Sequence, residues 1–211
     1  MMIPFKCRHS LLKVHAEKTP GKMGIQVWTL ARWSSYVYCY ELYGDHLVSE
    51  RADNHQAICE NGKIYVVRLT EGCGGKEVFC DNFFASAEIL AEMKQRDLGC
   101  TLTLRSGRTG RCPLQNKAEL RANGRGSFNF RLKIRSGILI CQWYENRTVT
   151  IGSNNHSVNP VGSCRKYDRK QKSFIEVQRP SPVNVYNQSM GGVDVAVQLL
   201  AFYRNYLKTK K

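Results

Sequence analysis

The sequence predicts an α/β fold in which one strand delivers a carboxylate immediately before a helix. The apolar run Val78–Cys80 follows a Gly74-Gly75 pair and ends in Asp81. From Ser86 to Arg96 the apolar residues then recur at the spacing of an amphipathic helix. Ligands of α/β sheets bind outside the carboxyl ends of strands, so Asp81 stands where a metal-binding acid is expected. The spacing equally fits an Asx turn at Asp81 followed by a serine N-cap.

The segments around this strand predict further sheet and helix. Residues 24–31 and 36–43 are rich in β-branched and aromatic side chains, and the polar link 32–35 between them suits a hairpin. Residues 61–71 have apolar residues at helical spacing, although their β-branched content also fits a strand. Residues 100–105 alternate like another strand.

The C-terminal half predicts a second hairpin and a final helix. Residues 128–134 and 137–144 alternate in hydrophobicity, and 148–152 add a further strand. Residues 153–182 are polar and are expected to form a connector. An apolar stripe at helical spacing after Gly191-Gly192 predicts the last helix.

Length, composition and charge point to a globular protein with an anionic partner. A chain of 211 residues suffices for one sizeable domain, and 42% hydrophobic residues allow a packed core. Thirty-two Lys and Arg against 17 Asp and Glu give a net charge of +15, for which nucleic acid is the first candidate partner and an acidic membrane surface the alternative. The sequence contains neither an apolar run of about 20 residues nor the apolar core of a signal peptide, so we expect an intracellular protein without membrane association.

Basic residues concentrate between Arg105 and Arg147, where ten Lys or Arg face only Glu119 and Glu145. Glycines make the first half of this segment loop-like, and the second half is β-rich. Such a segment suits contacts to the DNA backbone, although a solvated basic face without a partner has the same composition. The candidate DNA-binding residues are Lys6, Arg8, Arg105, Arg108, Arg111, Arg125, Arg131, Lys133, Arg135, Arg165 and Lys166.

Four strings of residues resemble motifs of the piggyBac transposase family and its domesticated derivatives. Two of them contain the acids, Phe79-Cys80-Asp81-Asn82-Phe83-Phe84-Ala85-Ser86 and Tyr186-Asn187-Gln188-Ser189-Met190-Gly191-Gly192-Val193-Asp194. The other two are Ile3-Pro4-Phe5-Lys6-Cys7-Arg8-His9-Ser10 and the stretch from Gln142-Trp143 to Ser153-Asn154. The resemblance covers nearly the whole chain.

The resemblance implies an RNase H-like core, a mixed β-sheet flanked by helices. Residues 1–106 would form its first part, 107–184 a basic β-rich insertion and connector, and 185–211 the last core helix, with both ends of the catalytic region truncated. In this family four acids bind two Mg²⁺ or Mn²⁺ ions, which cut DNA and join it at TTAA targets. Asp81 matches the second acid and Asp194 the third. Arg32 stands at the first position and Val197 at the fourth.

Three interpretations follow from these substitutions. The first is a degenerate, catalytically inactive transposase-derived domain, nuclear and DNA-binding, with no cofactor, in which Arg32 pairs with Asp81 or Asp194. The second is an active DDE-type transposase or nuclease, using Mg²⁺ or Mn²⁺, in which Glu41 or Asp45 replaces the lost acid. The third is a non-catalytic interaction module or relic fragment. A homodimer is expected, if at all, for a full-length form.

Overall fold

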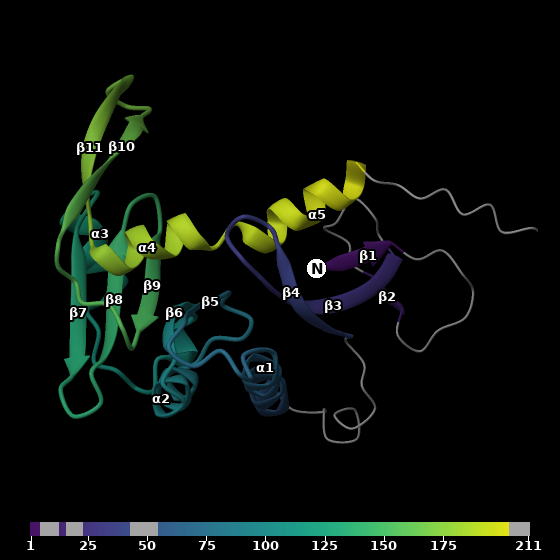
Figure 1. Cartoon of the computed structure of the whole chain (residues 1–211). Helices are drawn as coiled ribbons and strands as arrows, with labels where there is room; N and C mark the ends of the chain where they lie inside the picture. The colour runs from purple at the N-terminus through teal and green to yellow at the C-terminus, as the bar shows by residue number, and fades with distance from the viewer. Residues whose placement is uncertain (5–12, 16–22, 43–54, 203–211) are drawn as a thin grey trace, which may run out of the picture. The chain divides into compact units, whose positions relative to one another are not determined.

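The computed structural model describes residues 1–4, 13–15, 23–42 and 55–202 (Figure 1). These residues form two compact units, one of residues 1–61 with 189–211 and the other of residues 62–188. Lys6, Arg8 and Asp45 lie outside the described residues.

The second unit is built on a five-stranded mixed sheet. Its strands are β5 (Glu77–Cys80), β6 (Gly99–Leu104), β7 (Phe128–Lys133), β8 (Ile138–Tyr144) and β9 (Thr148–Ser153), in the order β5-β6-β9-β8-β7. The β5–β6 pair is parallel and the other pairs are antiparallel. All five strands were predicted, and the strands of the basic segment join the same sheet as β5.

The helix α2 (Ala87–Gln95) makes the crossover between the two parallel strands. Ser86 is its N-cap, with its hydroxyl accepting a hydrogen bond from the Ile89 N–H, as predicted. Ile89, Leu90 and Met93 are fully buried on the face toward the sheet. A Cβ at Gly152 of β9 would lie 2.7 Å from a Leu90 methyl carbon, so a glycine there lets the helix approach the sheet closely.

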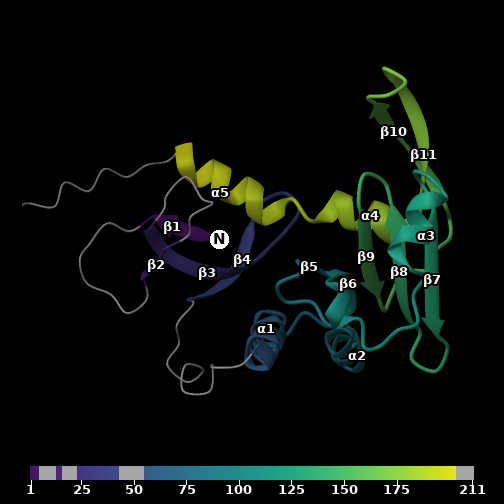
Figure 2. The same cartoon turned by 180° about the vertical axis from the view of Figure 1, so that it is seen from behind.

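Three elements lie where a polar connector or loop was expected. The segment 153–182 contains β10 (Gly162–Asp168) and β11 (Ser173–Arg179), an antiparallel two-stranded ribbon that projects beyond the five-stranded sheet (Figures 1 and 2). Its strands bury only Val177 fully, so they lack the apolar alternation that marks a half-buried strand. The short helix α3 (Lys117–Ala122) lies in the glycine-containing segment. The helix α4 (Ser181–Ser189) comes directly after β11.

The first unit contains a sheet centred on β3 (Met23–Ala31). This strand pairs with β1 (Met2–Pro4), β2 (Lys13–His15) and β4 (Val37–Leu42), all antiparallel. The predicted hairpin is confirmed, and its turn is closed by a 2.8 Å hydrogen bond from the Arg32 N–H to the Tyr36 carbonyl. The last helix, α5 (Gly192–Phe202), packs on β3.

The helix α1 (His55–Leu69) is confirmed as a helix, but it begins six residues before the predicted start at Asn61. No helix in the described part of the chain is long and apolar enough to cross a membrane.

Candidate functional site

Asp81 lies directly after β5, at the predicted strand end, and its side chain is exposed. Its carbonyl accepts a hydrogen bond from the Phe84 N–H at 3.1 Å, and its carboxylate accepts one from the Asn82 N–H at 2.5 Å. The acid therefore begins a tight turn at the strand end. The carboxylate bond is to the next residue, whereas an Asx turn is defined by a bond to the N–H two residues on, so the Asx turn stays a prediction.

Two arginines from the end of β6 hold this turn in place. Arg105 donates to the Asn82 side-chain oxygen at 3.0 and 3.3 Å. Arg108 donates to the Asn82 and Phe83 carbonyls at 3.3 and 2.9 Å. These residues were predicted as DNA contacts, and the structure places both against the loop that presents Asp81.

Tyr186 connects the two acid-containing strings within the second unit. Its hydroxyl lies 3.4 Å from the Cys80 carbonyl, directly before Asp81, and 3.3 Å from the Thr103 hydroxyl. Burial raises the pKa of Tyr186 to about 12, with a smaller contribution from the Asp81 charge. The phenol is therefore neutral at the end of β5. No role was predicted for Tyr186, although it opens the second acid-containing string.

In the first unit the structure brings the Arg32 and α5 positions together. A Cβ on Gly192 would lie 2.1 Å from the Arg32 carbonyl oxygen, so the start of α5 rests directly on the backbone at the end of β3. Asp194 is exposed in the first turn of α5. Its charge partly offsets the lowering of the Met1 ammonium pKa by burial. An ion pair between Arg32 and Asp194 stays a prediction.

Val197 and Glu41 are the other described residues that the predictions name for this site. Val197 follows Asp194 by three residues on α5, is 37% exposed and supplies no ligand. Glu41 of β4 lies opposite Trp28 in the β3–β4 register. Trp28 is three residues before the end of β3, so Glu41 lies about 10 Å along the strand from that end, where Arg32 follows. Within either compact unit, no three His, Cys, Asp or Glu side chains of the described residues converge to hold a metal ion.

Some of the predicted DNA-binding residues are exposed, and others form contacts within the protein. Arg131 and Lys133 of β7 and Arg135 after it are exposed on the edge of the five-stranded sheet, and we call these three residues the β7 basic face. Phe130 and Leu132 alternate with them and are 44% and 53% exposed. Arg111 and Lys166 are also exposed.

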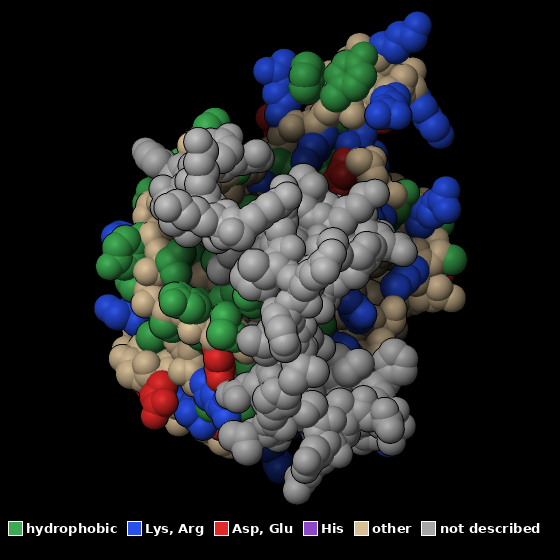
Figure 3. All heavy atoms as spheres, turned by 90° about the vertical axis from the view of Figure 1, so that its right-hand side faces the viewer, with side chains coloured by type: hydrophobic (Ala, Val, Ile, Leu, Met, Phe, Trp, Pro, Cys, Tyr) green, Lys and Arg blue, Asp and Glu red, His purple; other side chains and the backbone are tan. Residues whose placement is uncertain are grey.

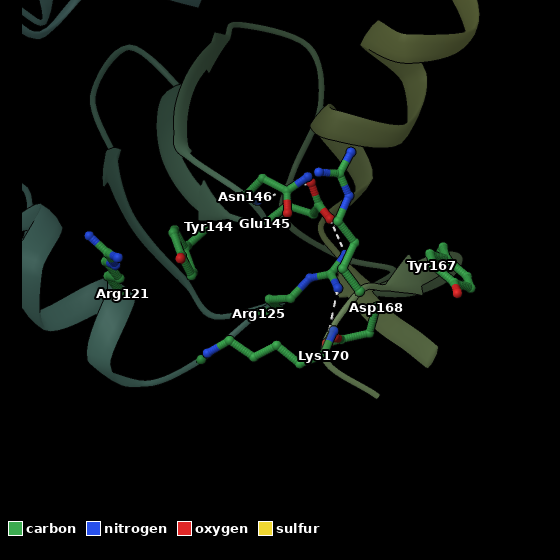
Figure 4. A pocket seen from close by; sticks show the side chains of 10 residues that line it. Arg121, Arg125, Tyr144, Glu145, Asn146, Tyr167, Asp168 and Lys170 are labelled. Carbon is green, nitrogen blue, oxygen red and sulfur yellow. Dashed lines mark hydrogen bonds and ion pairs between the residues drawn. The ribbon is translucent and has the colours of Figure 1, made fainter. Parts of the chain in front are cut away.

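Arg125 is committed to two carboxylates rather than to solvent. It forms ion pairs with Glu145, in a short hydrogen bond, and with Asp168 at 3.3 Å (Figure 4). All three side chains are at most one-fifth exposed. The predicted DNA contact at Arg125 is therefore a partly buried charge that connects β8 to the β10–β11 ribbon. Arg165 of that ribbon stacks over the Phe174 ring at 4.6 Å.

The string from Gln142 to Asn154 has structural roles. The Trp143 indole donates to the Gln178 carbonyl at 2.7 Å, which anchors β11 on the sheet. The buried Ser153 hydroxyl pairs with that of Thr101 at 2.9 Å. Asn154 accepts from the Cys100 N–H at 2.7 Å and donates to the Leu90 and Leu98 carbonyls at 3.0 Å. These hydrogen bonds stabilise the sheet and its contacts with α2 and β11.

Comparisons with known proteins define the class and then the family. A family model described as Transposase IS4 matches residues 1–211, so the chain is a transposase-type domain. It is 29% identical over its full length to human PiggyBac transposable element-derived protein 3, of which it covers 35%. It is 31% identical over 134 residues to human PiggyBac transposable element-derived protein 2, a match that covers 64% of this chain and 23% of that protein. The chain belongs to the piggyBac transposase family.

A solved structure supports the fold. The cryo-EM structure of piggyBac transposase in a synaptic complex with hairpin DNA matches with a TM-score of 0.69 at 19% identity. The match covers 95% of this chain and 39% of that one. The chain thus spans about a third of the length of these relatives.

Proposed function

We propose that this chain is a degenerate piggyBac transposase domain with an RNase H-like core that binds DNA but has lost metal-dependent catalysis. The observation that carries the proposal is in the first unit. There the carbonyl of Arg32, at the position of the first family acid, packs against Gly192 at the start of the helix that presents Asp194.

A charge count explains why the site would fail. Two-metal catalysis needs several carboxylates that converge on two divalent ions, and Mg²⁺ takes hard oxygen ligands. The resemblance implies three acids in the first unit, a charge of −3. Here Asp194 contributes −1 and Arg32 +1, which sum to zero, and Val197 contributes nothing. The residues at these three positions do not fit a pair of divalent ions.

The guanidinium adds repulsion to the loss of ligands. Arginine stays protonated at all physiological pH values, so its charge cannot be removed by a metal ion. Near a protein surface, repulsion between a guanidinium and a divalent ion about 4 Å apart is on the order of several kcal/mol. Retention of Asp81 and Asp194 is therefore insufficient for catalysis.

A nuclease assay with a DNA duplex and Mn²⁺ should show no cleavage above background, and metal-dependent cleavage would establish an active enzyme instead.

The DNA-binding part of the proposal rests on the β7 basic face. Arg131 and Lys133 alternate with Leu132 on the edge strand β7 and so share one face of it, about 6.7 Å apart, and Arg135 follows in the exposed turn. No further strand pairs with β7 in the described part of the chain. Exposed Lys and Arg in such a row can each neutralise a phosphate and release counterions. The solved relative was determined with hairpin DNA, which agrees with an anionic partner of this kind.

A salt titration tests this surface. Replacing Arg131, Lys133 and Arg135 by Ala should weaken duplex binding and flatten the slope of log K against log salt by up to about 2.7, at about 0.9 for each lost phosphate contact. The control replaces Leu132 and Ile134 by Thr on the same exposed segment, which keeps every charge and should leave the slope unchanged. An equal slope for the triple variant and the unmodified chain would show a solvated surface without a DNA partner.

A DNA partner also implies a nuclear location, which imaging of a tagged chain would test. We propose a homodimer only for a longer form of the protein, and sedimentation of that form would test it.

A further inference from the structure

A polar pocket in the second unit is not explained by the β7 basic face. It has a volume of about 700 Å³ and lies between α3, the β8–β9 turn and the β10–β11 ribbon (Figure 4). Arg121, Tyr144, Tyr167, Arg169 and Lys170 line it around the Arg125 side chain. This volume is within the range of pockets that enclose small organic ligands, and is far too small for a duplex.

The charges of the lining residues favour a phosphate. Arg121, Arg125, Arg169 and Lys170 contribute +4, and Glu145 and Asp168 contribute −2, which leaves a net charge of +2. Both carboxylates are paired with Arg125, so their repulsion of an anion is largely offset. The three other cations are exposed and have side chains long enough to reach a ligand in the pocket. Lys and Arg side chains gather at the projecting end of the ribbon, with apolar rings between them (Figure 3).

The aromatic lining favours a base beside that phosphate. Tyr144 is fixed at the end of β8, because its N–H donates to the Ser127 carbonyl and its own carbonyl accepts from the Gly126 N–H. Tyr167 is 51% exposed, and its ring is held edge-on against Phe174 at 5.3 Å. The two tyrosines flank Arg125 in the view of Figure 4. Exposed aromatic rings in a basic groove are the means by which proteins stack unpaired bases.

Local contacts hold the backbone of the two loops that carry the lining residues. Gly124 and Gly126 have φ near +90°, and a Cβ on Gly126 would lie 3.0 Å from the Gln178 nitrogen, so this loop requires glycine. Asp168 accepts hydrogen bonds from the Lys170 and Gln171 N–H groups at 2.7 and 3.2 Å, which fixes the turn that carries the cations. A fixed backbone lowers the entropy cost of binding to that of ordering the lining side chains.

We propose that this pocket binds an unpaired nucleotide of a nucleic-acid strand, with Arg121, Arg169 and Lys170 at its phosphate and Tyr144 and Tyr167 at its base. The inference rests on the nucleic-acid partner proposed above but not on the β7 basic face. A free mononucleotide offers the same chemistry, and the test separates the two sources.

The test measures, by fluorescence anisotropy, the affinity of the chain for a labelled single-stranded DNA of about 12 nucleotides and for a blunt duplex of the same sequence. In the full 211-residue chain, Tyr167→Leu should weaken single-strand binding by roughly 5- to 150-fold, the range for one stacked base, and duplex binding by less than about twofold. Tyr144→Leu should act in the same direction. Tyr40→Leu, an exposed strand tyrosine of the first unit, is the control and should change neither affinity. Circular dichroism melting establishes that each variant is folded, and the half-exposed Tyr167 keeps the test decisive if Tyr144→Leu is unstable.

Several outcomes would overturn the inference. Equal loss of single-strand and duplex affinity in Tyr167→Leu would place the tyrosine on a general DNA surface. Unchanged single-strand affinity in this variant would show that Tyr167 does not stack on a base. Competition by dTMP at concentrations comparable to those of the oligonucleotide would assign the pocket to free nucleotides, and equal competition by inorganic phosphate would reduce it to an anion site. If the β7 triple variant leaves duplex binding unchanged while Tyr167→Leu weakens single-strand binding, the proposed surface fails and the pocket stands.

Discussion

Asn154→Asp should destabilise the second unit strongly, because Asn154 joins three elements through its side-chain amide. The residue is 8% exposed. Its oxygen accepts from the Cys100 N–H of β6, and its nitrogen donates to the carbonyls of Leu90 on α2 and Leu98 before β6. Aspartate can still accept the first bond, but it offers no donor to the two carbonyls. Each orphaned buried group costs about 1–3 kcal/mol, so the expected loss of unfolding free energy is about 3–5 kcal/mol.

Urea unfolding followed by circular dichroism measures this loss. The control is Asn187→Asp, an exposed position of α4, which should change the unfolding free energy by less than about 0.5 kcal/mol. The penalty of Asn154→Asp should shrink at acidic pH, because a protonated carboxyl regains one donor. A loss below about 1 kcal/mol at pH 7, with an unchanged slope in urea, would refute the role given to the amide.

Two further predictions concern the positions around the two acids. Gly192→Ala should lower the unfolding free energy by about 2 kcal/mol or more, because the added Cβ would lie 2.1 Å from the Arg32 carbonyl oxygen. Gly191→Ala is the control and should have little effect, because its Cβ would have no neighbour within 4 Å. Thermal melting compares the two variants, and equal melting temperatures would contradict the packing of α5 on β3. Tyr186 has a pKa raised to about 12, so the unfolded chain loses this proton first and the stability that the tyrosine contributes should decline as the pH rises from about 10 to about 12. The difference in unfolding free energy between the unmodified chain and Tyr186→Phe should shift over that interval, and a constant difference would contradict the assignment.

The elements that were predicted correctly share a clear apolar period. The strand β5, its acid and the serine-capped helix α2 could be predicted because Val78, Cys80, Ile89 and Leu90 are core residues and repeat at the period of their element. The ribbon β10–β11 could not, because its outer face is made of charged and aromatic residues that packing does not select. The six-residue helix α3 is too short for a periodic signal.

The roles of individual polar residues were harder to predict than the elements. In the sequence Arg125 is one of ten cations in a basic segment, and nothing near it indicates an ion pair. Its partners Glu145 and Asp168 are 20 and 43 residues away along the chain and come close to it only in the fold. Asn154 likewise reads as one residue of a string, while its partners come from other elements. Asp81 and Asp194 could be named from the resemblance, since their strings are specific. The contact between Gly192 and Arg32 depends on the packing of α5 on β3, which composition and spacing do not reveal.

A calorimetric titration of the full chain with Mn²⁺ tests whether loss of the two acids at positions 32 and 197 has abolished metal binding. Three forms are compared: the unmodified chain, Arg32→Asn, which removes the charge without restoring a carboxylate, and Arg32→Asp combined with Val197→Asp, which restores both family acids. We predict no tight binding by the unmodified chain, little gain from Arg32→Asn, and measurable binding that approaches two ions by the double variant. Tight two-site binding by the unmodified chain would show that the metal site is intact and would favour an active metal-dependent enzyme.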